Sequence, residues 1–150
     1  MTVHCVDFLS AKRFDYSFIL SDETSVSVSE IGRYLYEPDV TLMKAQAFAT
    51  LCSRYAIAQL DYDTRLMTSS ELVADFPGRI FVIDETIPFS SKTLKQLRKI
   101  IPQANIATRN FIISADELRK RTGIRDGGDV YLFGAKVNGL GDTLLKCSKI

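Results

Sequence analysis

Basic side chains at helical spacing are the residues of this sequence whose chemistry is easiest to assign. They lie in the second half of the chain, in two runs separated by a strand-like segment. The first run is Lys92, Lys95, Arg98 and Lys99, the second is Arg119, Lys120, Arg121 and Arg125, and Arg109 with Asn110 lies between them. Positive side chains on helices bind the phosphate backbone of nucleic acids in a salt-dependent way, with little sequence readout. We therefore treat these ten residues as candidate nucleic-acid-binding residues.

The segment between the two runs adds chemistry of another kind. Arg109-Asn110-Phe111 offers a guanidinium, an amide and an aromatic ring, which together suit an unpaired RNA base. A structural reading is equally open at this point. In that reading Arg109 and Asn110 pin the adjacent turn, and the other basic residues solvate their helices.

The charge distribution supports a polyanionic partner for the second half alone. The chain has 150 residues and a net charge of +1. Residues 1–90 hold 7 Lys and Arg against 13 Asp and Glu, which gives −6. Residues 91–150 hold 12 against 5, which gives +7. A basic region on a nearly neutral chain is typical of a surface that binds a polyanion.

Residues for catalysis or metal binding are sparse. The single histidine, His4, cannot form a metal site or a catalytic triad alone, and the three cysteines form no Cys-x-x-Cys pair. Three carboxylate pairs could serve acid–base or metal chemistry, but they lie at the ends of expected elements, where acids often only solvate a turn. The cysteines are Cys5, Cys52 and Cys147, and the pairs are Asp22-Glu23, Asp61 with Asp63, and Asp84-Glu85. We expect reduced thiols and no catalytic or metal-binding residue.

No cofactor site is predicted either. A SAM (S-adenosylmethionine) or dinucleotide site of the Rossmann type needs a glycine-rich turn between a strand and a helix, whereas Gly127-Gly128 precedes a strand. No apolar run approaches the roughly 20 residues that span a bilayer. The first residues also lack the features of a signal peptide. The sequence predicts a cytoplasmic protein that makes no membrane contact.

The first half of the chain predicts two strands and one helix. Alternation and β-prone residues indicate strands at 3–8 and 14–18. Apolar residues at three- and four-residue intervals indicate a helix over about 39–57. Pro38 suits the first turn of this helix, and Asp39 can cap its free amides.

The second half predicts alternating strands and helices. Its helices start at Ser90 or Ser91 and at Ser114, where Glu117 would complete a capping box, and they stop at Pro102 and Gly123. The expected strands cover 79–83, 104–111, 130–133 and 143–147, with a turn at 126–129 and a hairpin loop at 138–141. The order is ββα followed by βαβαββ, which indicates an α+β fold with a mixed sheet.

Several strings in this second half resemble one known domain. Ala104 to Phe111, Glu117 to Lys120 and Asp126 to Phe133 resemble the THUMP-like domain that closes a family of proteins assigned as bacterial SAM-dependent methyltransferases. Upstream, Ile31 to Pro38, Lys44 to Phe48 and Phe76 to Arg79 resemble the small ferredoxin-like domain that precedes it. Gln46 stands where this family usually has glycine. The resemblance implies a ferredoxin-like domain over 1–78 and a THUMP-like domain over 79–150.

The same resemblance implies a function. In that family a methyltransferase domain lies N-terminal to this region and binds SAM, so this chain itself would hold no cofactor and no catalytic residue. Its expected partners are structured RNA and that methyltransferase domain. An alternative is a structural module that docks on the catalytic domain and orders it without contacting RNA. A freestanding small enzyme that uses a carboxylate pair is a third hypothesis, disfavoured by the sparse catalytic residues.

Overall fold

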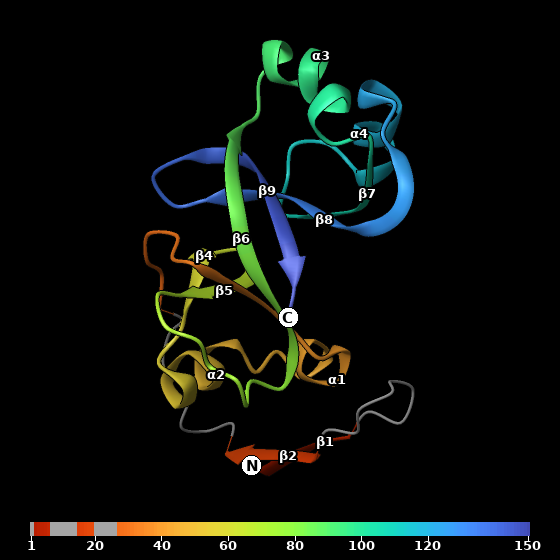
Figure 1. Cartoon of the computed structure of the whole chain (residues 1–150). Helices are drawn as coiled ribbons and strands as arrows, with labels where there is room; N and C mark the ends of the chain where they lie inside the picture. The colour runs from red at the N-terminus through yellow and green to blue at the C-terminus, as the bar shows by residue number, and fades with distance from the viewer. Residues whose placement is uncertain (1, 7–14, 20–26) are drawn as a thin grey trace.

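The computed structural model describes residues 2–6, 15–19 and 27–150 (Figure 1). Strands β1 (Thr2–Val6) and β2 (Asp15–Ile19) pair antiparallel in a small sheet of their own. The later strands in the described ranges join a second sheet of seven strands, and four described helices pack around it.

The first part of the large sheet holds three strands and two helices. They are β3 (Tyr34–Pro38), α1 (Val40–Lys44), α2 (Phe48–Tyr55), β4 (Ala58–Asp61) and β5 (Thr64–Ser69). The second part follows the predicted βαβαββ order. It consists of β6 (Gly78–Pro88), α3 (Ser91–Ile100), β7 (Gln103–Arg109), α4 (Ala115–Thr122), β8 (Arg125–Val137) and β9 (Gly141–Lys149).

One sheet runs through both parts. Its strand order is β4-β5-β3-β6-β9-β8-β7, and β3 of the first part pairs directly with β6 of the second. Only β7 and β8 run parallel among these paired strands, so the sheet is mixed, as predicted. The sheet also curls on itself: Asn138 donates from its backbone N–H to the carbonyl of Leu60, and the Thr64 hydroxyl donates to the carbonyl of Lys136.

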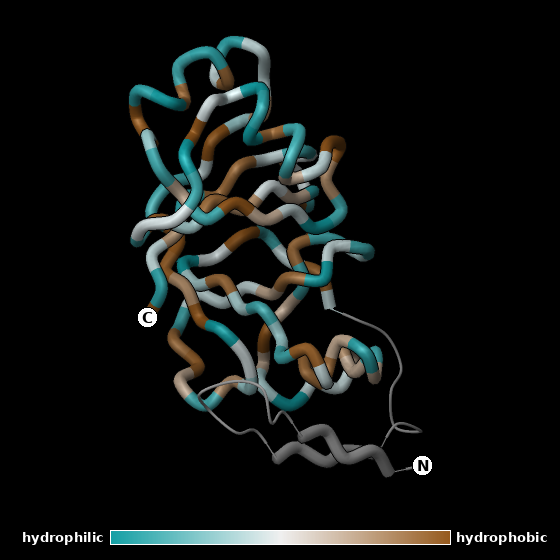
Figure 2. Tube along the Cα trace, turned by 90° about the vertical axis from the view of Figure 1, so that its right-hand side faces the viewer, coloured by the Kyte–Doolittle hydropathy of each residue, from teal (hydrophilic) through white to brown (hydrophobic). Residues whose placement is uncertain are grey.

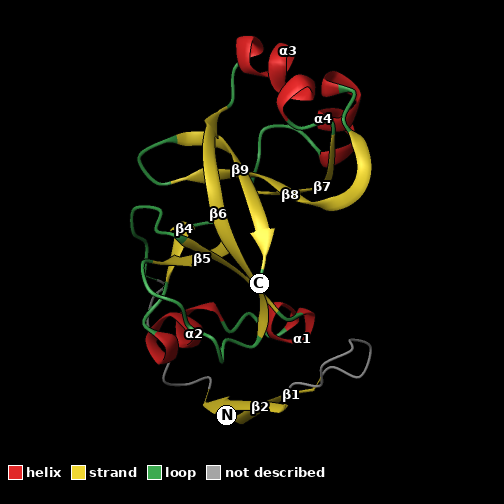
Figure 3. Ribbon diagram, in the orientation of Figure 1, coloured by secondary structure: helices red, strands yellow, loops and turns green. Residues whose placement is uncertain are grey.

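Three apolar clusters stabilise the fold. Helices α1 and α2 cover the sheet at one end and α3 and α4 at the other (Figure 3). The middle cluster takes Leu35 and Leu66 from the first part and Phe81, Phe133 and others from the second. In Figure 2 the hydrophobic segments follow the strands through the middle of the molecule. Because this cluster draws on both parts, neither part closes its core alone.

The helix expected over 39–57 is in fact two helices. Gln46 adopts φ 53°, in the left-handed region, and this residue separates α1 from α2. A side chain with a Cβ is disfavoured in that conformation, which suits the glycine usual at this position in the family. Pro38 ends β3 and does not open a helix, whereas Asp39 caps α1 as predicted by accepting from the backbone N–H of Thr41.

Strands β3, β4 and β5 were not predicted from the sequence, and the turn expected at 126–129 is also absent. Those residues lie inside the long strand β8, where Gly127 and Gly128 have φ values of 97° and 83°. Ala104 of β7 lies opposite Asp126 of β8, but the next residue, Asn105, lies opposite Tyr131. The intervening residues of β8, 127–130, therefore bulge out of the pairing with β7. The side-chain amide of Asn105 donates to the carbonyls of Gly128 and Val130 and holds the bulge in place.

The predicted helix boundaries in the second part are confirmed. Ser90 and Thr93 form a capping box at the start of α3. Ser114 caps α4 by accepting from the backbone N–H of Glu117, but the predicted capping box is not completed, because the Glu117 carboxylate accepts from Arg121 instead. Gly123 ends α4 with φ 73°.

Burial of Cys147 leads to a pH-dependent stability. Its side chain is fully buried, and desolvation, with a smaller contribution from the charge of Asp84, raises the pKa of the thiol from 9.0 to about 12. The unfolded chain therefore loses this proton at a lower pH than the folded chain does. The stabilisation that the protonated Cys147 thiol contributes is fully present below pH 9 and is lost as the pH rises toward 12.

We predict that this thiol alone lowers the free energy of unfolding by about 1.4 kcal/mol between pH 7 and pH 10. Urea titrations of the native chain and of Cys147→Ala at both pH values isolate the contribution. The native chain should lose about that much more than the variant. Equal losses in the two proteins would show that Cys147 ionises as easily in the folded state as in the unfolded state.

Candidate nucleic-acid interface

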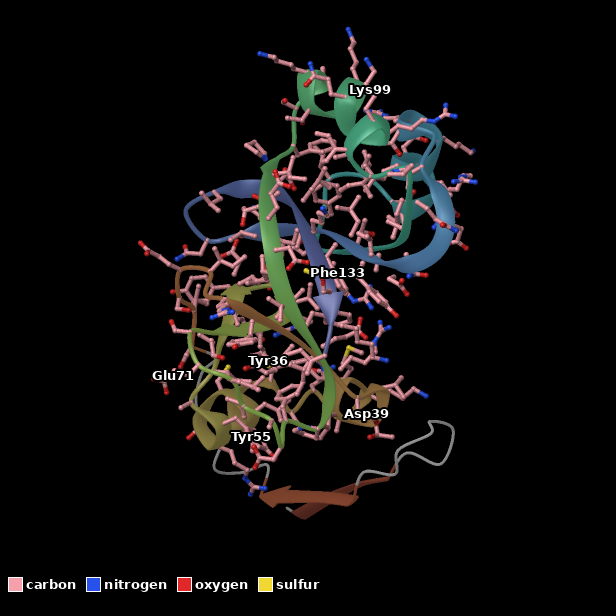
Figure 4. The ribbon with its side chains drawn as sticks, in the orientation of Figure 1. Tyr36, Asp39, Tyr55, Glu71, Lys99 and Phe133 are labelled. Atoms are coloured by element: carbon pink, nitrogen blue, oxygen red, sulfur yellow. The ribbon has the colours of Figure 1, made fainter. Side chains whose placement is uncertain are left out.

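Helix α3 presents a face of uncompensated positive charge. Leu97 is buried and Leu94 packs against the cluster beneath the helix, which orients the opposite face to solvent. On that face Lys92, Lys95 and Lys99 are exposed at spacings of three and four residues. The helix has no acidic residue, and its lysines form no ion pair within the described part of the chain. Lys99 extends from this end of the molecule (Figure 4).

Helix α4 carries charge that is partly compensated. Arg121 pairs with Glu117 at 3.0 Å, four residues earlier on the same helix. Arg119 pairs with Asp126 at 3.1 Å and lies 3.7 Å from Asp116. Pairs of this kind on exposed surfaces leave little net positive potential at these two arginines.

Six of the nine candidate cations therefore have no acidic partner among the described residues. They are Lys92, Lys95, Arg98, Lys99, Lys120 and Arg125. All six come from α3, α4 and the first residue of β8, and α3 and α4 contact each other. The arginine Arg98 lies against Gly123, where α4 ends. We call this end of the molecule the basic end (Figure 1).

The structure places Arg109 and Asn110 away from the basic end. Arg109 donates from Nη2 to Oε2 of Glu37 at 3.0 Å, and Asn110 donates from Nδ2 to the Thr64 hydroxyl at 3.3 Å. Both acceptors belong to the first part of the sheet. The two residues thus tie β7 to β3 and β5, and Nη1 of Arg109 also donates to the carbonyl of Thr108 at 2.9 Å, close to the turn.

The stacking set Arg109-Asn110-Phe111 is not assembled on one surface. The ring of Phe111 packs edge-on against Phe89, with 4.9 Å between centroids, in the cluster beneath α3 and α4. It lies so close to Gly134 that a Cβ there would meet the ring at 2.8 Å. Phe111 therefore serves packing on one face of the sheet while Arg109 points to the other.

An ion cluster missed by sequence reasoning lies at the junction of the two parts. Glu37 is 7% exposed and accepts from Arg79 at Oε1, at 2.6 Å, and from Arg109 at Oε2. We call these three residues the Glu37 cluster. Arg79 and Arg109 are 42 and 72 residues from Glu37 in the sequence, so no local sequence motif indicates this cluster.

The carboxylate pairs form no candidate catalytic or metal centre in the described part of the chain. Asp61 accepts from the backbone N–H of Tyr62, and Asp84 accepts from the Ser148 hydroxyl. No group of three or more His, Cys, Asp or Glu side chains that could hold a metal occurs among the described residues. The pair Asp22-Glu23 lies outside them. None of the described helices is long and apolar enough to cross a bilayer.

Comparison with known proteins divides the chain at the same junction. Residues 34–77 match a family described as a ferredoxin-like domain, and residues 78–149 match one described as THUMP domain-like. A crystal structure described as a "putative methyltransferase from Porphyromonas gingivalis W83" superposes with a TM-score of 0.90 at 38% identity. The match covers 99% of this chain and 38% of that chain, so this chain spans well under half of its relative. No curated protein matches the chain.

The Glu37 cluster predicts a large stability difference between two arginine substitutions. Arg109→Met removes one partner from a buried carboxylate and should lower the free energy of unfolding by about 1–3 kcal/mol. Arg121→Met removes the partner of an exposed carboxylate on α4 and should cost about 0.5 kcal/mol or less. Urea denaturation of the two variants measures both values. Similar losses would mean that the cluster does not join the two parts.

Proposed function

Because residues 34–149 belong to the ferredoxin-like and THUMP domain-like families, we propose that this chain is the accessory region of an RNA methyltransferase and helps to hold its RNA substrate. The structural relative is described as a "putative methyltransferase" and is much longer than the region it shares with this chain, which supports this assignment. In this proposal a separate methyltransferase domain, N-terminal to this region, binds SAM and carries out the reaction.

The observation that carries the RNA-binding part of the proposal is the basic end. Six cations that have no acidic partner within residues 2–6, 15–19 and 27–150 gather on α3, α4 and the start of β8. Lys92 and Lys99 are separated by roughly 10 Å along the helix axis, so the lysines present a row of charge and not a single point. Such a row suits a phosphate backbone, and binding of this kind is sequence-independent and strongly weakened by salt.

The absence of exposed aromatic residues from the basic end decides which RNA fits it. Within the described part of the chain α3 and α4 carry no aromatic side chain, and the nearby rings of Phe89 and Phe111 pack against each other. Unpaired bases are held mainly by stacking on aromatic side chains. The basic end therefore favours structured RNA, which it would contact through phosphates.

This proposal predicts that charge reversal on α3 weakens RNA binding. Lys95→Glu/Lys99→Glu should lower the affinity for an RNA hairpin at least about ten-fold at low salt. It should also reduce the slope of log K against log salt by about 2, because two phosphate contacts are lost. Filter binding of the whole chain over a range of salt concentrations measures both quantities.

A matched control reverses two lysines that lie elsewhere. Lys44, on α1, and Lys136, on β8, are exposed and form no ion pair among the described residues. Lys44→Glu/Lys136→Glu changes the net charge by the same amount and should leave most of the affinity intact. If both double variants bind RNA equally well, the basic end is not the contact surface. If the native chain binds no RNA, a docking role on the methyltransferase domain replaces the proposal.

A further inference from the structure

A second surface with nucleic-acid chemistry lies beside the Glu37 cluster. Asn105 and Tyr131 are direct partners across β7 and β8, and Arg109 projects from the same face of β7 because it is four residues further along the strand. Arg79 reaches the same place from β6, with its Cζ 5.8 Å from the centre of the Tyr131 ring. We call Arg79, Asn105, Arg109 and Tyr131 the Tyr131 patch.

The ring of Tyr131 is half-buried and packs against an aromatic residue of the core. Phe81, which is fully buried, packs against it with 5.0 Å between ring centroids. Arg79 also lies over Phe81, at 5.4 Å, so its guanidinium is positioned by two rings. The Tyr131 hydroxyl has no hydrogen-bond partner among the described residues. The patch thus offers a half-buried aromatic ring that packs against the core and carries a hydroxyl with no partner in the described part of the chain.

The polar groups around the ring are oriented in advance. The side-chain Nδ2 of Asn105 donates to two backbone carbonyls of β8, and its Oδ1 has no donor among the residues that the structure describes. Glu37 accepts from Nε of Arg79 and from Nη2 of Arg109, and Nη2 of Arg79 lies within ion-pair distance of the same carboxylate. Nη1 of Arg79 and Nε of Arg109 therefore remain able to donate.

The charge balance of the patch favours an anion. Two guanidinium groups share one carboxylate, so the Glu37 cluster keeps a net charge of +1. The side chains of Arg79 and Arg109 are 43% and 33% exposed, so both remain accessible. A guanidinium fixed by a buried partner loses little further conformational freedom when it binds phosphate.

From these observations we infer that the Tyr131 patch binds one unpaired nucleotide. The base stacks on Tyr131 beside Arg79, and the phosphate is bound by Arg79 and Arg109. Oδ1 of Asn105 accepts from an exocyclic amino group, as adenine and cytosine carry. The inference rests on the proposed function for its source of nucleotide, an unpaired stretch of the RNA whose paired region lies on the basic end. A free nucleotide carries the same base and phosphate groups, so it is the second possible source of this ligand.

The test compares two RNAs that differ only in an unpaired segment. The native chain should bind a hairpin with a short adenine-rich overhang about ten-fold more tightly than the blunt hairpin, the gain that stacking of one base provides. Tyr131→Leu keeps an apolar side chain over Phe81 and should abolish the advantage of the overhang while leaving the blunt affinity unchanged. Tyr131→Phe keeps the ring and should retain most of the advantage. Urea denaturation verifies that both variants are folded.

The outcomes separate this inference from the proposed function. An overhang that gives no advantage, or an advantage that survives in Tyr131→Leu, overturns the Tyr131 patch while the basic end still binds RNA. If neither hairpin binds, the proposed function fails. Binding of adenosine monophosphate by itself then tests whether the Tyr131 patch is a nucleotide site. Quenching of tyrosine fluorescence by this nucleotide in the native chain, lost in Tyr131→Leu, would support a site for a free nucleotide. Without that quenching the patch is no nucleotide site.

Discussion

A buried carboxylate between two guanidinium groups joins the two halves of this molecule. Removing Glu37 from water is costly, and the cost is offset only where Arg79 and Arg109 both reach it. That requirement fixes β3, β6 and β7 relative to one another, because each strand supplies one of the three side chains. The apolar cluster beside it takes Leu35 from β3 and Phe81 from β6, and it adds Phe133 and other residues from neighbouring strands of both halves. The ferredoxin-like and THUMP-like segments are therefore halves of one folded body.

This arrangement gives the proposed RNA surfaces a fixed geometry. The long strand β6 begins at the Glu37 cluster and ends next to α3, so it connects the Tyr131 patch with the basic end through a continuous element. Paired RNA on the basic end and an unpaired nucleotide on the patch would then be held at a set separation. In this proposal the region presents RNA, and the methyltransferase domain supplies the catalytic residues.

The features that could be predicted from the sequence are those that depend on residues close together in the chain. The caps at Ser90, Ser114 and Gly123 were predictable because each motif is complete within four residues. The break at Gln46 and the bulge at Gly127-Gly128 were not, since the first interrupts a regular apolar pattern and the second depends on Gln103 and Asn105 of another strand. The missed strands β4 and β5 are short, and β5 is largely buried on both faces, which hides the alternation that marks a strand. Of the candidate site, the cations of α3 were visible in the sequence, and the pair of Arg121 with Glu117 is local to one helix. The ion pairs of Arg109 with Glu37 and of Arg119 with Asp126 depend on the fold.

Native-state hydrogen exchange tests most directly whether the two halves form one cooperative body. Amide protons of β3, such as that of Leu35, and of β9, such as that of Leu145, lie in strands on either side of β6 within the large sheet. If the halves fold as one unit, the slowest amides of both strands will exchange with the same free energy of opening and respond equally to denaturant. Two distinct free energies, with one half exchanging while the other stays protected, would contradict the account.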